Sequence, residues 1–290
     1  MTNRRSTYLG NVEDNLDMEK ERNSRAPHRY STTMEKLLVV VEFLAKRSAK
    51  ESVGIVDISR GTGIEKAAVY RALNTLVEND YVLKRGSGYG LSSKIVWLAG
   101  EYLDHLDVRR IAHPYLRELA EATGELSFLA IREGKESVII EKAEGSSDLR
   151  VFSHIGSRFP LHCGATGKLF LAFARPEERS QLLSELEYTK YTENTITDSD
   201  EMERHLEEVR RSGIGRNDFE QDHQKRAMAV PIFDAHNEVV AAVSVAGLGL
   251  RLTDERMLEV KQLLQNAGAR ISEEMGYYTD NKSGYWAQDK

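Results

Sequence analysis

The segment PLHCGATGK, residues 160–168, has the composition of a reactive or ligand-binding loop. A phosphate-binding P-loop would need glycine at position 162 and Ser or Thr at position 169, where the chain has His162 and Leu169. A nucleophile with its base is not expected either, because the adjacent His162 and Cys163 point to opposite faces of an extended chain. The glycines predict a helix start, whose free N–H groups and dipole favour a carboxylate, although a simple helix cap explains the same pattern.

Zinc is another candidate occupant of this segment. The four residues that could form the site are His162, Cys163, Asp222 and His223. Their side chains are ligand types that zinc accepts, and they would gather if their two loops meet in space. No C-x-x-C or H-x₃-H spacing supports them, so the prediction contains no metal and no cofactor, and metal analysis of untagged protein would test this.

A second set of candidate contacts lies in GTGIEKAAVYRALNTLVENDYV, residues 61–82. Val69, Leu73 and Leu76 repeat at helical spacing and predict a buried face. The opposite face carries Ala67, Tyr70, Arg71 and Asn74. An amphipathic helix with basic residues outside is usually only a solvated helix, so its neighbours must decide whether it contacts a partner.

The flanking segments predict a winged helix-turn-helix. A helix is expected to start near Ser31, VDISR (56–60) predicts a short second helix, and YVLKRGSGYGLS (81–92) predicts a hairpin. Helix, short helix, turn, helix and hairpin in this order is the winged helix-turn-helix plan. The helix of residues 61–82 would then enter a DNA major groove. The expected DNA contacts are Ser59, Thr62, Lys66, Ala67, Tyr70, Arg71, Asn74, Lys84 and Arg85.

Charge is distributed unevenly along the 290 residues. Residues 31–95 carry 10 Lys+Arg against 7 Asp+Glu, a net of +3, whereas residues 96–290 carry 24 against 34, a net of −10. A DNA-binding domain joined to a larger acidic sensor would show this asymmetry. The single cysteine, and the lack of a secretory signal or an apolar run of about 18 residues, predict a cytoplasmic protein without a membrane segment.

The rest of the chain mixes strands with helices without βαβ alternation, which predicts an α+β domain with an antiparallel sheet. Strands are expected at 126–132, 137–142 and 149–153, and two more within 227–248. Helices are expected at 94–105, 110–123, 167–173, 176–186, 200–212 and 254–275. The predicted domains are a disordered tail at 1–30, a winged helix-turn-helix at 31–93, a linker helix at 94–109, an effector-binding domain at 110–276 and a C-terminal tail at 277–290.

Four blocks of the chain resemble the IclR family of transcriptional regulators, in the family's order and spacing. They are VDISRGTGIEKAAVYRALNTLVENDYV, RRIAHPYLRELAEATGE, GSRFPLHCGATGKLFLAF and AVPIFDAHNEVVAAVSVAG. The resemblance implies a winged helix followed by a GAF-like effector domain. It also implies dimers or tetramers on double-stranded operator DNA, a small organic-acid or aromatic effector, and no enzymatic activity. A metabolite- or zinc-binding module, or an enzyme using the second domain, is the competing interpretation.

The resemblance also points to the effector site residue by residue. The implied ligand contacts are Gly164, Ala165, Asn217, Lys225, Ala227, Ser244 and Ala246. Two departures from the family pattern stand out. Ala67-Ala68 replaces a common Ser-Thr pair at the start of the DNA-contacting helix, which predicts an unusual operator preference. Ala227 stands where the family often has Cys, which would suit a bulkier or partly apolar ligand.

Overall fold

The computed structural model describes residues 32–47, 52–104, 107–147 and 151–277. The predicted tail at 1–30 lies outside these residues, as does all of the predicted C-terminal tail except Tyr277. The chain forms two compact units, residues 1–100 and 101–290. Within the described residues, no helix has the length and apolar character that crossing a membrane requires.

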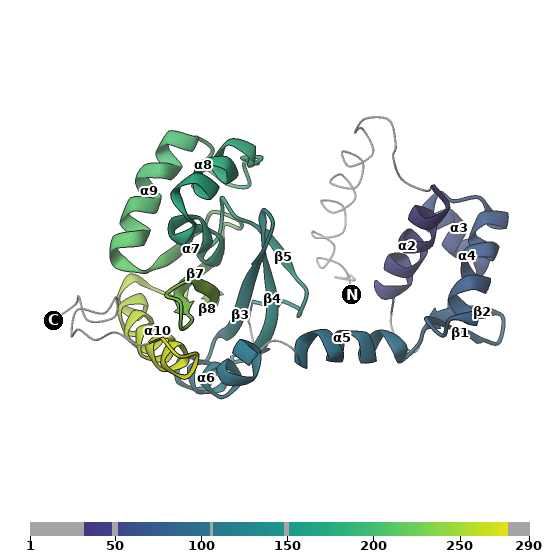
Figure 1. Ribbon diagram of the computed structural model, residues 1–290, viewed down its shortest axis with the longest axis horizontal. Helices are drawn as coiled ribbons and strands as arrows, with labels where there is room; N and C mark the ends of the chain where they lie inside the picture. The colour runs from purple at the N-terminus through teal and green to yellow at the C-terminus, as the bar shows by residue number, and fades with distance from the viewer. Residues whose placement is uncertain (1–31, 48–51, 105–106, 148–150, 278–290) are drawn as a thin grey trace, which may run out of the picture. The chain divides into compact units, whose positions relative to one another are not determined.

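The first unit is built from helices and a two-stranded hairpin (Figure 1). In chain order these are α2 (Thr32–Ala45), α3 (Ile55–Thr62), α4 (Lys66–Glu78), β1 (Val82–Arg85), β2 (Gly88–Leu91) and α5 (Lys94–Asp104), which continues past the unit's boundary. Val40, Leu44, Ile58, Val69, Leu73 and Leu76 form its core, so the predicted buried face of α4 is confirmed. In α3, Val56 is 47% exposed whereas Ile58 is fully buried, so the core face of this helix follows Ile58.

The second unit is an antiparallel sheet between two layers of helices, so the α+β prediction is confirmed (Figure 1). The strands run in the order β5-β4-β3-β8-β7-β6. They are β3 (Leu126–Glu133), β4 (Glu136–Ala143), β5 (Arg158–Pro160), β6 (Gly215–Asp218), β7 (Lys225–Phe233) and β8 (Val239–Leu248). The helices are α6 (Asp107–Thr123), α7 (Ala165–Phe173), α8 (Pro176–Glu185), α9 (Ser199–Ser212) and α10 (Asp254–Glu274). Helices α6 and α10 pack on one face, whereas α7 packs on the other and contacts α8 and α9.

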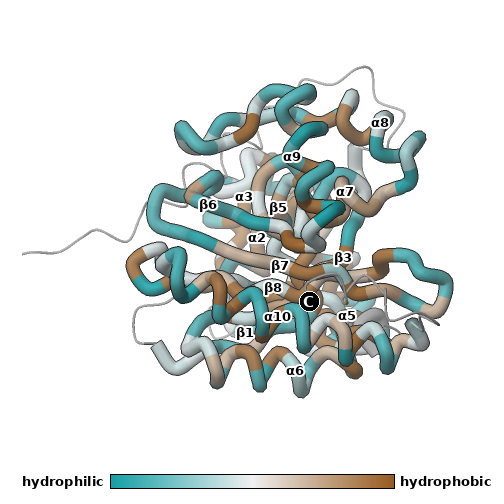
Figure 2. Tube along the Cα trace, turned by 90° about the vertical axis from the view of Figure 1, so that its left-hand side faces the viewer, coloured by the Kyte–Doolittle hydropathy of each residue, from teal (hydrophilic) through white to brown (hydrophobic). Residues whose placement is uncertain are grey.

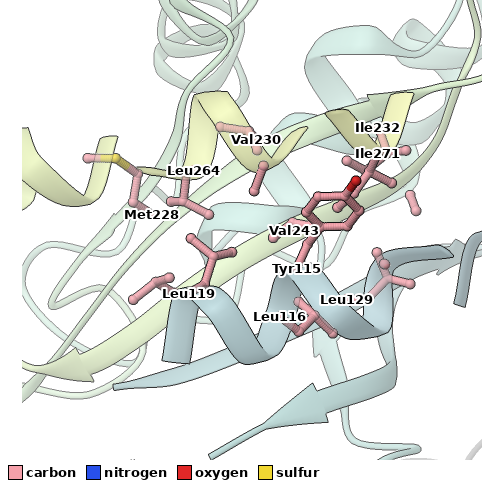
Figure 3. Packing of buried hydrophobic residues seen from close by; sticks show 14 of the residues in the cluster. Tyr115, Leu116, Leu119, Leu129, Met228, Val230, Ile232, Val243, Leu264 and Ile271 are labelled. Carbon is pink, nitrogen blue, oxygen red and sulfur yellow. The ribbon is translucent and has the colours of Figure 1, made fainter. Parts of the chain in front are cut away.

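Each face of the sheet has its own apolar cluster. On the α6 and α10 side, Leu116 and Leu119 meet Leu264 and Ile271 over the strand residue Val243 (Figure 3). The second cluster joins α7 and α9 to the same strands. Helix α6 alternates between hydrophilic and hydrophobic residues along its length, as an amphipathic covering helix does (Figure 2).

Two strand predictions need correction at the edges of the sheet. Residues 151–153 are not a strand, and residues 149–150 lie outside the described part; the edge strand is β5, which pairs with β4. Strand β6 was not expected, because its sequence GRND lacks apolar alternation. It exists because its backbone pairs with β7, from Gly215↔Ala229 to Asp218↔Arg226. Edge strands depend on such partners more than on their own residues.

Two glycines allow α7 to lie close to its neighbours. A Cβ on Gly215 would lie 2.0 Å from the Ala165 carbonyl oxygen, and one on Gly167 would lie 2.6 Å from the Leu161 carbonyl oxygen. Both clashes are with backbone atoms, which cannot move aside as a flexible side chain can. The first turn of α7 is therefore fixed against β6 and the loop that precedes the helix.

We expect Gly167→Ala to lower the free energy of unfolding by about 2–3 kcal/mol, because the added methyl overpacks a backbone contact. Gly100→Ala is the matched control: no atom lies within 4 Å of its Cβ position in α5, so it should be neutral or stabilise by up to about 1 kcal/mol. Urea denaturation followed by circular dichroism measures both. Equal effects from the two variants would contradict the close packing at Gly167.

Candidate nucleic-acid interface and ligand site

Helices α3 and α4 are joined by a three-residue turn, Gly63 to Glu65. Gly63 adopts the left-handed conformation, with φ of 69°, that lets the chain reverse sharply after α3. Ser59 Oγ donates to the Ile64 carbonyl oxygen at 2.6 Å. Thr62 Oγ1 donates to the Ile58 carbonyl oxygen at 2.7 Å. The two hydroxyl groups that were expected to contact DNA therefore donate hydrogen bonds within the protein and help to position α4.

The outer face of α4 presents a set of exposed side chains. These are Lys66, Ala67, Tyr70, Arg71 and Asn74, with Tyr70 51% exposed. Among the residues that the structure describes, Lys66 and Arg71 form no ion pair. Two long cationic side chains without a partner in the described part of the chain are available to neutralise phosphates or to donate to base edges.

The hairpin adds basic residues at its tip. Lys84 and Arg85 end β1 opposite Tyr89 and Gly88, and both side chains are exposed. Gly86 follows with φ of 60°, which makes the tight turn possible. A basic hairpin tip beside a basic helix is the arrangement that a winged helix-turn-helix requires for backbone contacts.

In the second unit, strand register brings most of the implied effector contacts together. Asn217 pairs with Ala227, and Ala227 pairs with Ala246, so the three side chains form one row on the α7 face of the sheet. Ser244 lies two residues from Ala246 on the same face, and its Oγ donates to the Met228 carbonyl oxygen at 2.9 Å. That bond satisfies the hydroxyl hydrogen as in an ordinary strand.

Gly164 and Ala165 complete the group from α7. Gly164 caps the helix with φ of 105°, and Gly215 of β6 contacts the Ala165 carbonyl oxygen directly. The remaining residue, Lys225, lies at the start of β7 with its side chain partly exposed, and its Nζ pairs with Asp222 Oδ2 at 2.8 Å. The structure therefore gathers six of the seven residues and leaves Lys225 at the rim.

A buried ion pair lies beside this group and was missed in the sequence. Lys168, whose side chain is fully buried, pairs with the Glu220 carboxylate. Glu220 Oε2 also accepts from the Gly164 N–H at 3.4 Å, and the Glu220 N–H donates to Asn217 Oδ1 at 2.9 Å. Lys168 was visible in GATGK only as part of a rejected P-loop, and nothing in the sequence paired it with a residue 52 positions away.

The candidate zinc ligands do not form a metal site. His162 is buried, with Nε2 2.9 Å from the Thr189 carbonyl oxygen, whereas His223 is exposed and its Nδ1 lies 3.4 Å from Glu193 Oε2. Burial raises the pKa of the Cys163 thiol to about 12, so the free thiol is protonated at neutral pH. No group of three His, Cys, Asp or Glu residues in the described part of the chain could hold a metal ion.

Family models match both units. The model of the IclR helix-turn-helix domain matches residues 33–86, and the model of the bacterial transcriptional regulator IclR C-terminal domain matches residues 100–273. The chain is 33% identical over 266 residues to the HTH-type transcriptional regulator KdgR of Escherichia coli, covering 91% of this chain and 98% of KdgR. It is 30% identical to XynR of the same organism, covering 84% and 97% of the two chains.

Solved structures agree with this likeness. The crystal structure of the Thermotoga maritima IclR aligns with a TM-score of 0.75 and 28% identity, covering 86% of this chain and all of that one. The C-terminal domain of E. coli KdgR aligns with a TM-score of 0.55 and 35% identity, covering 59% of this chain and all of that one.

His205 of α9 lies near the buried ion pair and generates a pH prediction. Burial, reinforced by the positive charge of Lys168, lowers the pKa of His205 to about 4, although Asp218 acts in the opposite direction. Its Nε2 is buried and has no hydrogen-bond partner among the residues that the structure describes. The unfolded chain takes up a proton here near the usual pKa of 6.5, and the folded chain does so only near 4.

The contribution of His205 to the free energy of unfolding is therefore fully present above pH 6.5 and is lost as the pH falls toward 4. Between pH 7 and pH 4.5, we expect the free energy of unfolding of His205→Asn to fall by about 2 kcal/mol less than that of the wild type. His236→Asn, which changes an exposed histidine, should follow the wild-type profile. Urea denaturation at several pH values measures the slopes, and identical slopes for the wild type and His205→Asn would refute the assignment.

Proposed function

We propose that this chain, which belongs to the IclR family of DNA-binding transcriptional regulators, binds operator DNA through α4 and the β1–β2 hairpin and senses a small molecule in its second unit. It is a regulator and not an enzyme, as its relatives KdgR and XynR are transcriptional regulators. We further propose the boundaries 31–93 for the DNA-binding domain, 94–109 for the linker and 110–276 for the effector domain.

The observation that carries the DNA-binding proposal is the unpaired basic face of α4. Lys66 and Arg71 are exposed, and neither is neutralised by an acid of the described chain. We assign Arg71, Tyr70 and Asn74 to the base edges of a major groove and Lys66 to a phosphate. Lys84 and Arg85 of the hairpin would contact the adjacent backbone.

Ala67 shapes what this helix can recognise. Its methyl group is exposed in the first turn of α4, where a hydroxyl would donate a hydrogen bond. A methyl group can only make apolar contact, for example with a thymine methyl. We therefore propose an operator preference that differs from that of relatives with Ser or Thr at this position.

The apolar surface of α5 supports assembly into dimers. Val96 and Trp97 are 72% and 56% exposed, and the neighbouring Leu98 is also exposed. Three consecutive exposed apolar side chains on one helix are costly in water and favour burial against an equivalent helix of a second copy. Such a dimer would present two α4 helices to successive major grooves of a pseudo-palindromic site, and a pair of dimers would form the tetramer.

The effector site proposed for the second unit comprises Gly164, Ala165, Asn217, Ala227, Ser244 and Ala246, with Lys225 at the rim. The helix start of α7 and the row of small side chains on the sheet support a small organic acid or aromatic acid. Ligand binding that favours one arrangement of the DNA-binding domains would change operator affinity, and coupling of about 1–3 kcal/mol suffices for a switch.

Removing the α4 charges should abolish operator binding. We expect Lys66→Ala with Arg71→Ala to weaken binding of the full-length protein to its own promoter DNA at least tenfold, and to reduce the log–log salt slope by about 2, because two phosphate or base contacts are lost. Fluorescence anisotropy at several salt concentrations measures both quantities.

The matched control removes two exposed positive charges from the second unit, Lys190→Ala with Arg211→Ala. This variant should bind DNA as the wild type does, because the lost charges lie outside the helix-turn-helix. Similar losses in both double variants would mean that only net charge matters, and the assignment of α4 would be wrong.

Charged substitutions in the apolar surface of α5 should dissociate the proposed dimer. We expect Val96→Asp with Trp97→Asp to shift the protein toward its 32.8 kDa monomer in sedimentation velocity, because charges would be buried in the interface. Leu250→Asp changes a single apolar residue that is 88% exposed on a turn, and this control should keep the wild-type dimer. A double variant that sediments as the wild type does would exclude this surface as the interface.

A further inference from the structure

Glu65 is the residue at which the turn after α3 enters helix α4. Its carbonyl oxygen accepts from the Ala68 N–H at 2.9 Å and from the Val69 N–H at 3.0 Å, so its backbone is fixed by the first turn of the helix. The residue is exposed, and its side chain does not cap the helix. Among the residues that the structure describes, the Glu65 carboxylate has no hydrogen bond and no ion pair. It is therefore available to an external partner.

The other acids of the helix-turn-helix have different surroundings. Residues 55–78 contain three acids, Asp57, Glu65 and Glu78. Asp57 Oδ1 lies 3.8 Å from Arg60 Nη1, so its charge is offset within α3. Glu78 ends α4, about 20 Å from Glu65 at 1.5 Å of rise per residue. Of these three acids, Glu65 lies at the N-terminal end of α4, the end that a helix-turn-helix directs at base edges.

A carboxylate at this end of α4 opposes binding to DNA in general. Binding to any DNA sequence gains from neutralising phosphate charges with Lys and Arg. Glu65 adds a negative charge beside Lys66, and it lies at the positive end of the α4 dipole, which otherwise attracts a phosphate. Glu65 therefore weakens sequence-independent binding. This cost is offset only where the DNA offers the carboxylate a hydrogen-bond donor.

Cytosine offers the most suitable donor in the major groove. An ionised carboxylate only accepts hydrogen bonds. The amino groups exposed in the major groove are N4 of cytosine and N6 of adenine. The adenine amino group lies beside N7, an acceptor that repels a carboxylate oxygen, whereas the cytosine edge presents only its donor. Glu65 therefore matches cytosine better than any other base.

We propose that Glu65 is a specificity-determining residue of the DNA interface, whose carboxylate accepts a hydrogen bond from the N4 amino group of a cytosine and repels DNA that lacks this donor. This inference rests on the proposed operator binding through α4. It adds a base preference to those of the assigned contacts, because Lys66 and Arg71 donate to phosphates or guanine and Asn74 matches adenine. The same negative charge rejects other sequences, so one side chain supplies both the attraction and the repulsion that specificity requires.

The first test compares promoter DNA with random DNA. Fluorescence anisotropy measures the binding of the full-length wild type, Glu65→Gln and Glu78→Gln to the protein's own promoter fragment and to a random duplex of the same length. Glutamine keeps the side-chain shape and removes the charge. Glu65→Gln should therefore bind random DNA about twofold more tightly, and its preference for the promoter should fall about fivefold or more.

Glu78→Gln is the matched control for this test. It removes the same charge at the other end of α4, so it should keep the wild-type preference for the promoter. An unchanged preference in Glu65→Gln, or an equal loss of preference in both variants, overturns the proposal.

The second test identifies the base. Each C·G pair of the promoter site is replaced in turn by A·T, and binding is measured again. At the pair that Glu65 contacts, the wild type should lose about tenfold in affinity, whereas Glu65→Gln should bind the A·T version more tightly, because glutamine binds adenine N6 and N7 together. At the other pairs the two proteins should lose affinity equally. If no pair distinguishes the two proteins, Glu65 does not read a base and the proposal is wrong.

A third variant separates the base contact from the effect of charge on the helix. Glu65→Asp keeps the negative charge, and aspartate is a favourable residue at the start of a helix, so this variant should fold with the wild-type circular dichroism spectrum. Its shorter side chain does not extend to the base, so the dependence on cytosine should be lost. A dependence equal to that of the wild type would show that charge alone sets the preference, which contradicts the contact.

The same measurements distinguish failure of this inference from failure of the proposed function. A wild type that binds its promoter no better than random DNA would refute operator binding and this inference together. If the wild type prefers its promoter, the Lys66 and Arg71 variant loses binding and Glu65→Gln keeps every base preference, operator binding through α4 stands and only the role of Glu65 is refuted.

Discussion

The contact between the first turn of α7 and strand β6 is the constraint on which the second unit's site depends. Gly215 has no Cβ, so β6 approaches the Ala165 carbonyl oxygen closely, and Gly167 lets the same turn pack against Leu161. This approach brings the free N–H groups of a helix start over a sheet of small side chains. Any side chain at Gly215 would force the helix away and separate the donors from Asn217.

A buried ion pair stabilises that arrangement and also limits the chemistry of the site. Isolated burial of Lys168 would cost several kcal/mol, and its pairing with Glu220 offsets most of this. The same Glu220 fixes Asn217 through its backbone N–H. Glu220, in the loop between β6 and β7, therefore neutralises Lys168 and orients the Asn217 amide. A change in this loop would alter both the charge of the site and the direction of the Asn217 amide.

In the first unit too, internal hydrogen bonds fix the backbone that positions the residues of the proposed site. Ser59 and Thr62 use their hydroxyl groups to hold the turn between α3 and α4, and Lys66 and Arg71 of α4 form no ion pair with any residue that the structure describes. A rigid turn with a free basic face is what recognition of a stiff duplex needs, because the side chains then reach the groove at a fixed spacing.

The sequence by itself determined the elements with strong periodicity. The buried face of α4, the hairpin after it, most helices of the second unit and the family membership could all be predicted, because apolar spacing and turn residues act locally. Tertiary structure alone decided the remainder. Strand β6 exists through pairing with β7, Ser59 and Thr62 bond within the turn, and Lys225 pairs with Asp222 at the rim. The orientation of Asn217 depends on Glu220, and the partner of Lys168 lies 52 residues away. Such long-range pairs leave no periodic pattern in the sequence, because they depend on which backbone segments the fold brings into contact.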